Sequence, residues 1–429
     1  MAPPNKAAWL ALGFLLASIA PAKPAPTDVL HEANAICRGD NGALWGVSLC
    51  GPILLVDPQT RSVFASQADP EKQLKQAGEI FVGKLPEQIN VANTAVDWAG
   101  TRWTMIMLPL PEEKEQRAAL IGHEMWHRIQ DKLGLPQSGA ANDHLDTRDG
   151  RYWLQLEWRA LAAALQIAGP AREEAIKDAA LFRAKRRQMF PDAAKTGREM
   201  ELNEGLAEYT GAKLSGARDP ARFVVEHELK DASAKNTFVR SFAYATGPAY
   251  GLLLDETGAN WRQTIRQTRR DLAEILLERA GLKLPEKIEA AADEHATKYR
   301  GAELAAKEDR REQARREVAK NYRARLVDGT VLVIPLQKMN MQFDPGNLMP
   351  LDSLGTVYPN IRVVDEWGIL TVSKGGALIS ADFNRITVPA PGNRHGKLVE
   401  GDGWNLELKS GWIILPGERA GDFKMRPVE

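Results

Sequence analysis

His123-Glu124-Met125-Trp126-His127 is the most informative motif of the chain, and it lies in a predicted helix over 116–133. Residues four apart lie on one face of a helix, so the two imidazoles project side by side and can reach one metal ion. Zinc accepts imidazole nitrogen, and a catalytic zinc ion takes three protein ligands and keeps one position for water. Glu124 can reach that water and is the candidate general base. The competing interpretation is a pair of polar side chains on a helix surface.

A metal held by two histidines needs a third protein ligand, and a carboxylate is the usual one in proteases of the His2Glu type. Glu204 supplies a carboxylate within Glu201-Leu202-Asn203-Glu204-Gly205-Leu206-Ala207-Glu208-Tyr209, on a helix predicted over 197–214. Glu208 lies one turn later, where an exposed acidic face and a functional role are equally good interpretations. Glu157, on a helix predicted over 150–168, is a rival third ligand.

Asn203-Glu204-Gly205-Leu206-Ala207 resembles the second motif of the gluzincin metallopeptidases, above all the aminopeptidase N-like family and more distantly the thermolysin-like enzymes. The resemblance implies His123, His127 and Glu204 as zinc ligands, with Glu124 as the base. Tyr244-Ala245-Thr246-Gly247-Pro248-Ala249 is similar to a segment of that family whose Tyr stabilises the transition state. Tyr244 is therefore the candidate for this role, with an ordinary buried Tyr as the alternative.

The sequence departs from the aminopeptidase pattern in two places. The stretch from Asp131 to Met200 separates the second His from the third-ligand motif, whereas the aminopeptidases have roughly one short helix there. The Gly-Ala-Met-Glu-Asn motif, which binds the substrate amine in that family, has no match. The resemblance covers roughly residues 90 to 260 and does not imply exopeptidase action on a free N-terminus.

Two β-rich runs, Val91–Trp98 and Arg102–Leu108, flank Ala99-Gly100-Thr101 and are typical of a hairpin. The resemblance implies that Arg102–Leu108 is an edge strand beside the zinc, which accepts the substrate as an added strand. Trp98 and Trp103 either line a pocket there or belong to the core, and the core is favoured because large aromatics dominate cores.

The rest of the chain predicts an α+β protein: a zincin-like metallopeptidase domain, with a β-hairpin and a mostly helical part, followed by a small all-β domain. Residues 301–326 are dense in Arg, Glu, Lys and Ala and predict a solvated helix between two domains. Residues 327–429 are rich in Val, Ile, Trp, Gly and Pro, which is typical of short strands. The predicted divisions are 1–22, 23–90, 91–300, 301–326 and 327–429.

The N-terminus has the features of an export signal. Lys6 precedes the apolar run Ala7–Ala20, and Ala20-Pro21-Ala22 has the small-x-small pattern of a cleavage site. We therefore predict a signal peptide over 1–22 and a periplasmic or secreted protein without stable membrane insertion. Cys37 and Cys50, within a mixed segment expected to form strands, then form a disulfide or stay as two buried thiols.

The net charge of the chain argues against some classes of binding partner. The chain has 56 basic and 56 acidic residues and a formal net charge of zero, so it offers no general field for nucleic acid. The expected partner is a peptide or protein substrate, and the expected cofactor is Zn²⁺. The predicted function is an exported zinc metallopeptidase. The alternatives are an envelope binding or assembly protein on a catalytically idle zincin fold, and a zinc hydrolase of non-peptide amides or esters.

Overall fold

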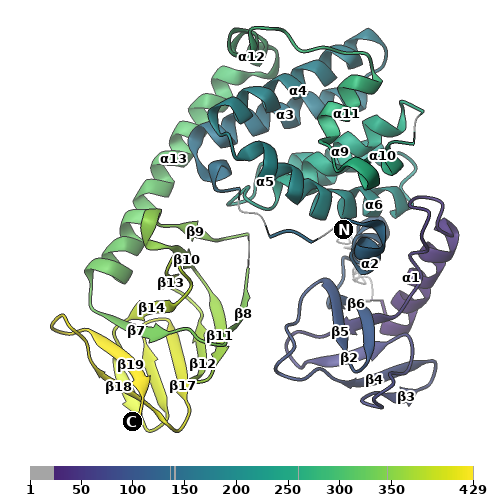
Figure 1. Ribbon diagram of the computed structural model, residues 1–429. Helices are drawn as coiled ribbons and strands as arrows, with labels where there is room; N and C mark the ends of the chain where they lie inside the picture. The colour runs from purple at the N-terminus through teal and green to yellow at the C-terminus, as the bar shows by residue number, and fades with distance from the viewer. Residues whose placement is uncertain (1–23, 136, 140–141, 259, 345, 429) are drawn as a thin grey trace, which may run out of the picture.

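The computed structural model describes residues 24–135, 137–139, 142–258, 260–344 and 346–428. It is a mixed α+β structure in which an N-terminal sheet is followed by a helical region and then by a β-rich C-terminal part, as Figure 1 shows. The α+β class expected from the sequence is confirmed. The predicted signal peptide over 1–22 lies outside the described residues. Among these residues, no helix combines the length and the apolar character needed to cross a bilayer.

The N-terminal region begins with a helix that the sequence did not predict, since residues 23–80 were expected to form strands. This helix, α1 (Pro26–Asp40), starts with Pro at its first turn and ends at Asn41, whose left-handed φ of 46° terminates it. Cys37, near its end, forms a disulfide with Cys50, so of the two interpretations of these cysteines the bridged one is correct. The strands that follow are β1 (Ile53–Val56), β2 (Ser62–Ala65), β3 (Lys75–Ala77), β4 (Ile80–Lys84), β5 (Thr94–Trp98) and β6 (Thr101–Met107).

These strands form one sheet in the order β3-β4-β2-β1-β6-β5, and β5 and β6 make the expected hairpin. The expectation that residues 102–108 form an edge strand is wrong. The wholly buried β1 pairs in parallel with β6, from Ile53 opposite Thr104 to Val56 opposite Met107, so β6 is internal and β5 is the edge. Trp98 and Trp103 belong to the core on this sheet, as favoured.

The helical region follows directly from β6. Its helices are α2 (Lys114–Ile129), η1 (Gln130–Leu133), η2 (Asp143–Asp146), α3 (Arg148–Gln166), α4 (Pro170–Met189), α5 (Ala193–Met200), η3 (Glu201–Gly205), α6 (Leu206–Leu214), α7 (Pro220–Phe223), η4 (Val224–Leu229), α8 (Lys230–Ala232), α9 (Phe242–Asp255), α10 (Trp261–Thr268), α11 (Leu272–Arg279), α12 (Ile288–Ala296), η5 (Thr297–Tyr299), α13 (Gly301–Arg323) and η6 (Ala324–Asp328). The helical pattern of the sequence predicts one helix over 260–280 and one over 286–324, but each of these is broken in the structure. Arg269 and Arg300 adopt left-handed φ angles of 52° and 56°, and each ends a helix there.

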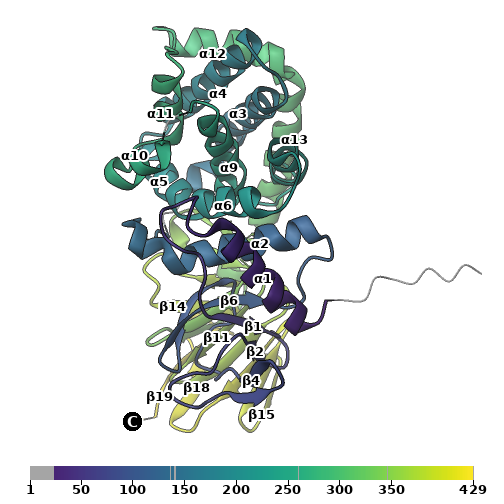
Figure 2. The same ribbon diagram turned by 90° about the vertical axis from the view of Figure 1, so that its right-hand side faces the viewer.

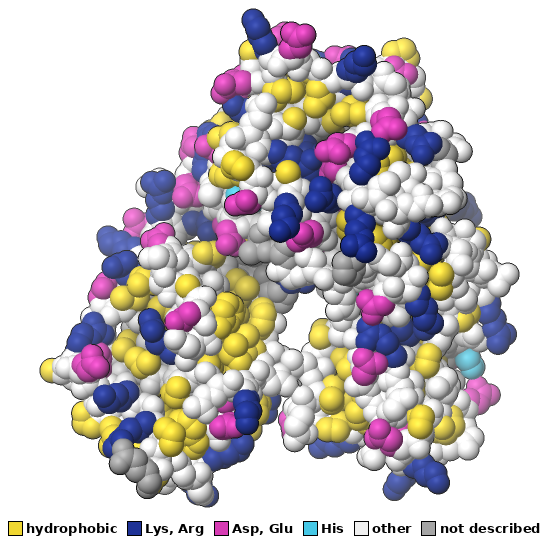
Figure 3. All heavy atoms as spheres, in the orientation of Figure 1, with side chains coloured by type: hydrophobic (Ala, Val, Ile, Leu, Met, Phe, Trp, Pro, Cys, Tyr) yellow, Lys and Arg dark blue, Asp and Glu magenta, His cyan; other side chains and the backbone are white. Residues whose placement is uncertain are grey.

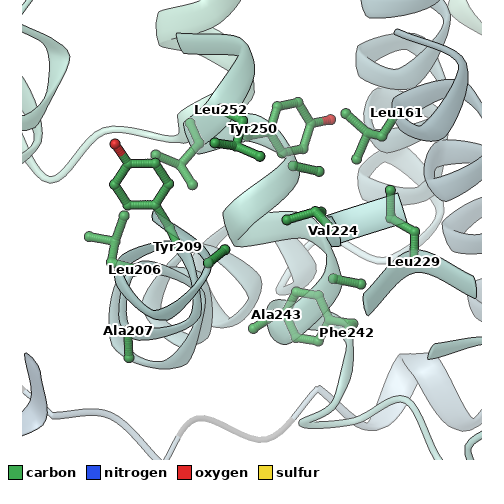
Figure 4. Packing of buried hydrophobic residues seen from close by; sticks show 14 of the residues in the cluster. Leu161, Leu206, Ala207, Tyr209, Val224, Leu229, Phe242, Ala243, Tyr250 and Leu252 are labelled. Carbon is green, nitrogen blue, oxygen red and sulfur yellow. The ribbon is translucent and has the colours of Figure 1, made fainter. Parts of the chain in front are cut away.

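One hydrophobic core joins α1, α2 and the helices that follow them. Figure 4 shows part of it, where α6 contributes Leu206 and Tyr209, α9 contributes Phe242 and Leu252, and η4 contributes Val224. Helices α5, η3 and α6 form a continuous helical run from residue 193 to 214, and α9 packs against it. This packing fixes the region around Glu204 from several sides.

The charged helix α13 runs from the helical region to the C-terminal strands, as Figure 1 shows. The expectation of a solvated helix holds for only part of its surface. Leu304 and Glu308 are fully buried, and Glu308 accepts a 2.6 Å hydrogen bond from Arg151 of α3. An ionised side chain buried without a partner is costly, and this ion pair offsets part of that cost. The helix is therefore anchored to α3.

The C-terminal strands form two sheets that share one core. The elements are β7 (Val331–Pro335), β8 (Asn340–Phe343), β9 (Met349–Pro350), η7 (Asp352–Leu354), β10 (Thr356–Tyr358), β11 (Ile361–Asp365), β12 (Gly368–Val372), β13 (Ala377–Ile379), β14 (Arg385–Pro389), β15 (Asn393–His395), β16 (Leu398–Gly401), β17 (Trp404–Leu408), β18 (Trp412–Pro416) and β19 (Phe423–Pro427). Ile334 and Ile386 from one sheet and Leu370 and Leu406 from the other are buried together.

The N-terminal and C-terminal β regions touch through polar contacts. The Asn340 side chain donates a 2.8 Å hydrogen bond to the Gln88 carbonyl, and Arg362 lies 3.6 Å from Glu87. Figure 3 shows an opening above this contact, bordered by the helical region and by both β regions. The edge strands β5 and β8 belong to the two β regions on either side of it.

Candidate metal centre

The two histidines of the starting motif face each other on α2. His123 and His127 are both buried, and their Nε2 atoms lie 3.0 Å apart. Neighbours on the far side of each ring fix this orientation. Nδ1 of His123 lies 2.7 Å from Oε2 of Glu208, and Nδ1 of His127 lies 3.1 Å from Oε1 of Gln130. Each acceptor favours a proton on Nδ1, which leaves both Nε2 lone pairs facing the same point.

Glu204 brings the third ligand atom to that point. Its Oε2 lies 3.6 Å from Nε2 of His123 and 3.5 Å from Nε2 of His127. The three residues are buried, and their ligand atoms are close enough to hold one metal ion. Glu204 belongs to the π-helical turn η3 between α5 and α6, and such turns occur frequently at functional sites.

Close contact between α2 and α6 is what allows the ligands to meet. At Gly211 of α6 an added Cβ would overlap the carbonyl of Ala119 on α2, and at Gly122 it would lie 3.2 Å from Cα of Gly211. Two glycines on facing helices therefore let the backbones approach more closely than any side chain would permit. The helix that continues from Glu204 is held directly against the helix that carries both histidines.

The other oxygen of Glu204 is bound from the opposite side. Oε1 accepts 3.1 Å hydrogen bonds from Nδ2 of Asn203 and from Nη2 of Arg240, while Oε2 accepts a 2.6 Å bond from the Tyr244 hydroxyl. Burial raises the pKa of Glu204, but the contacts of its carboxylate with His123 and His127 outweigh burial and hold the pKa well below its usual range. The carboxylate is therefore ionised, as a metal ligand must be.

Glu124 lies beside the three ligand residues and keeps one oxygen without a partner. Its Oε1 is 3.9 Å from Nε2 of His123, and its buried Oε2 has no hydrogen-bond partner among the described residues. Burial raises the pKa of Glu124, and the attraction of His123 and His127 opposes that rise. A buried carboxyl with a raised pKa and an unused oxygen is suited to accept and return a proton.

Tyr244 packs directly on the ligand set. Its ring stacks on His123 with centroids 5.4 Å apart and planes 10° apart, and its hydroxyl donates to Glu204 as described above. Burial and the nearby Glu204 carboxylate raise the pKa of Tyr244 well above its usual value. The hydroxyl therefore stays protonated and remains a donor.

Glu157, the rival third ligand, lies elsewhere. It is fully buried and accepts hydrogen bonds of 2.7 Å from Arg183, 2.7 Å from Arg186 and 3.0 Å from Tyr250. Burial raises the pKa of Glu157, and these arginines lower it further than burial raises it. This carboxylate therefore belongs to a buried ion network between α3 and α4.

Sequence reasoning missed two residues of the centre and left a third undecided. Gln130, the first residue of η1, lies three residues after His127, so this helical spacing could have indicated a partner for that ring. Arg240 precedes α9 by two residues and carries no local signal in the sequence. Glu208, for which exposure and function were equally good interpretations, contacts His123.

No protein-family model, no curated protein and no solved structure matches this chain.

Proposed function

We propose that this protein is an exported zinc-dependent metallopeptidase of the gluzincin type, which hydrolyses peptide bonds with a water molecule activated by Glu124. The observation that carries the proposal is the convergence of three ligand atoms, Nε2 of His123, Nε2 of His127 and Oε2 of Glu204, beside the unpartnered oxygen of Glu124. These three buried atoms can all coordinate one metal ion, and a candidate general base lies beside them.

The residues fit zinc. Tetrahedral zinc with bonds of about 2.0 Å separates its ligand atoms by about 3.3 Å, and the three separations here are 3.0, 3.5 and 3.6 Å. Two imidazoles and one carboxylate suit zinc better than calcium or magnesium, which prefer oxygen ligands. Three protein ligands leave the fourth position open for water. When bound, zinc would polarise the scissile carbonyl and lower the pKa of that water.

The chain's own groups divide the remaining work. Glu124 accepts the proton of the attacking water and delivers it to the leaving amine. Glu208 and Gln130 keep the two imidazoles in the required tautomer. The Tyr244 hydroxyl donates to Glu204 in this structure. During catalysis it would turn toward the carbonyl oxygen of the substrate and stabilise the negative charge that develops there.

A peptide substrate fits the surroundings of the site. β5 is an edge strand next to α2, so its outer backbone groups can pair with an extended polypeptide. This strand takes the role that the resemblance to gluzincins implied for residues 102–108.

Export agrees with the chemistry of the chain. The Cys37–Cys50 disulfide is typical of an oxidising compartment, and the features of residues 1–22 are those of a signal peptide. These two features support our proposal that the protein acts in the periplasm or outside the cell.

The decisive experiment measures zinc content and peptide cleavage on the same purified material. We expect one zinc per chain and cleavage of a peptide library that stops with a chelator and returns with added zinc. Small esters and amides tested in parallel identify a non-peptide hydrolase if they alone are turned over. A zinc-loaded protein inactive on every substrate class would favour a binding or assembly role. Protein that binds no transition metal after supplementation would overturn the proposal.

A further inference from the structure

A loop closed by the disulfide lies against the back of the metal centre. Cys37 lies in the last turn of α1 and Cys50 precedes β1, so the bond closes the intervening segment into a ring. Figure 2 shows α1 beside α2, and Arg117 of α2 donates a 2.7 Å hydrogen bond to Glu32 of α1. We call residues 41–50 the disulfide loop.

The disulfide loop binds α2 at the residue after the second ligand. Nη2 of Arg128 donates hydrogen bonds of 2.8 Å to the carbonyl of Leu49 and 2.9 Å to the carbonyl of Cys50. An added Cβ on Gly51 would overlap the Arg128 guanidinium, so the chain passes directly over this group. The end of the loop is therefore attached to the helical turn that carries His127.

Trp45, in the middle of the loop, touches both ligand-bearing helices. Its ring lies 6.0 Å from Trp126 of α2 and meets Tyr209 of α6 edge-on at 6.3 Å. Its indole N–H donates a 2.9 Å hydrogen bond to Thr210 of α6. Trp126 directly precedes His127, and Tyr209 directly follows Glu208, the partner of His123.

We propose that the disulfide loop is a positioning element for the metal centre, so that tight zinc retention depends on oxidation of Cys37 and Cys50. The inference rests on the proposed function only in taking the ion to be zinc. Metal affinity depends on the groups that orient the ligands, and Trp45 and Arg128 fix the helices behind both histidines. In the reduced chain the loop gains conformational freedom, and these contacts weaken.

Oxidation is a thiol–disulfide exchange. The two thiols lose two electrons and two protons and form one S–S bond, while a disulfide-bearing oxidant takes up the electrons and protons and becomes a dithiol. Oxidation should therefore strengthen zinc retention. A chain that is still reduced retains zinc weakly, and a chain that has entered an oxidising compartment retains it tightly.

The test compares zinc affinities measured by competition with a chromogenic chelator, which needs no substrate. A variant carrying Cys37→Ala and Cys50→Ala should bind zinc about 10-fold more weakly than the oxidised protein. Trp45→Phe keeps an aromatic ring but loses the bond to Thr210, and should weaken zinc binding about 3-fold, within the range of a lost neutral hydrogen bond. Wild-type protein treated with a phosphine reductant should behave like the cysteine variant.

The matched control is Trp367→Phe. Trp367 is also fully buried, and its indole donates a 2.7 Å bond to the Pro335 carbonyl, but it lies in the C-terminal β region. This variant should lose stability and keep its zinc affinity, which separates positioning from general destabilisation. If the cysteine variant fails to fold, the zinc affinity of Trp45→Phe tests the inference instead. Wild-type zinc affinity in Trp45→Phe and in the reduced protein would overturn the inference, whereas a wild type that binds no zinc would overturn the proposed function instead.

Discussion

Gly247 of α9 lies against Gly205 of η3 so closely that neither position has room for a side chain. A Cβ added to Gly247 would overlap the backbone of Gly205, and one added to Gly205 would lie 3.0 Å from Cα of Gly247. This contact joins the turn that carries Glu204 to the helix that carries Tyr244. Both glycines belong to the motifs that indicated the site in the sequence, and here they have a packing role.

Gly247→Ala should separate these two elements. Overpacking a close backbone contact costs about 1–3 kcal/mol, so we expect a lower free energy of unfolding in urea and weaker zinc binding. Gly197→Ala is the matched control. Gly197 lies in α5, where an added Cβ would meet its nearest neighbour at 3.7 Å. Because alanine favours helix over glycine, this variant should gain about 0.5–1 kcal/mol. Equal stabilities of the two variants would contradict the close contact.

Glu208→Gln tests the orientation of His123. The amide either donates to Nδ1 or accepts from it more weakly than the carboxylate does, so the tautomer with its lone pair on Nε2 is less favoured. We expect zinc affinity to fall roughly 10-fold, a typical effect of removing a partner of a metal-ligating histidine. Glu226→Gln, at an exposed acid on η4, should leave the affinity unchanged. Unchanged zinc affinity in Glu208→Gln would show that Glu208 does not orient His123 for metal binding.

Glu157→Gln and Glu204→Gln together test which carboxylate completes the site. Glu157 is paired with two buried arginines, so its neutralisation should cost roughly 3 kcal/mol or more of stability and leave one zinc per folded chain. Glu204→Gln should lose zinc, and its metal-free form should lose less stability than metal-free Glu157→Gln, because among the described residues the only arginine paired with Glu204 is the partly exposed Arg240. Elemental analysis and urea unfolding of both variants distinguish the two roles. Loss of zinc from folded Glu157→Gln would reverse the assignment.

Local pattern was enough to predict that His123 and His127 lie side by side. His123 and His127 are one helical turn apart on a predicted helix, and the structure has that helix with both rings buried. Glu204 needed more than local pattern, because more than 70 residues separate it from His127 and only its motif distinguished it from Glu157. Arg240, which binds the same carboxylate, lies outside any motif and meets Glu204 only through the packing of α9.

The wrong prediction of the edge strand comes from a contact between distant segments. The parallel pairing of β1 with β6 joins residues about 50 positions apart, and the sequence of either strand does not specify it. A hairpin can be predicted from its turn, but its edge depends on a third strand. The breaks at Arg269 and Arg300 were missed for a different reason. Both residues take a left-handed conformation that glycine usually supplies, so composition gave no signal.

His144 makes the free energy of unfolding of the protein depend on pH under acidic conditions. It lies close to α4, where Nη1 of Arg186 is 3.2 Å from its Nε2. Burial, followed by the charges of Arg186 and Arg187, lowers the pKa of His144 from 6.5 to about 3. The unfolded chain therefore takes up a proton at a higher pH than the folded chain does. This contribution to stability is complete above pH 6.5 and is lost as pH falls toward 3.

His144→Gln should therefore lose less stability than the wild type between pH 7 and pH 4.5, because the proton taken up on unfolding is gone. Urea unfolding midpoints at the two pH values give the comparison. His31→Gln, at an exposed histidine on α1, should keep the wild-type difference. A wild-type pH difference in His144→Gln would show that this ring does not contribute.

Glu124→Gln tests the base without disturbing the ligands. The substitution preserves the shape of the side chain and leaves Nε2 of His123, Nε2 of His127 and Oε2 of Glu204 in place, so zinc binding should persist. Turnover should fall about 10²–10⁴-fold, the usual contribution of a positioned acid or base. The amide cannot accept the water proton, and the loss should appear in kcat with little change in KM.

The matched control is Glu115→Gln on the same helix. Glu115 is exposed in the first turn of α2, away from the ligand residues, so its neutralisation should change neither zinc content nor kcat. Peptide hydrolysis at saturating substrate and zinc stoichiometry, measured on both variants, give the answer. Full activity of zinc-loaded Glu124→Gln would assign the proton transfer to another group. Tyr244 would not qualify, because its raised pKa keeps it a donor.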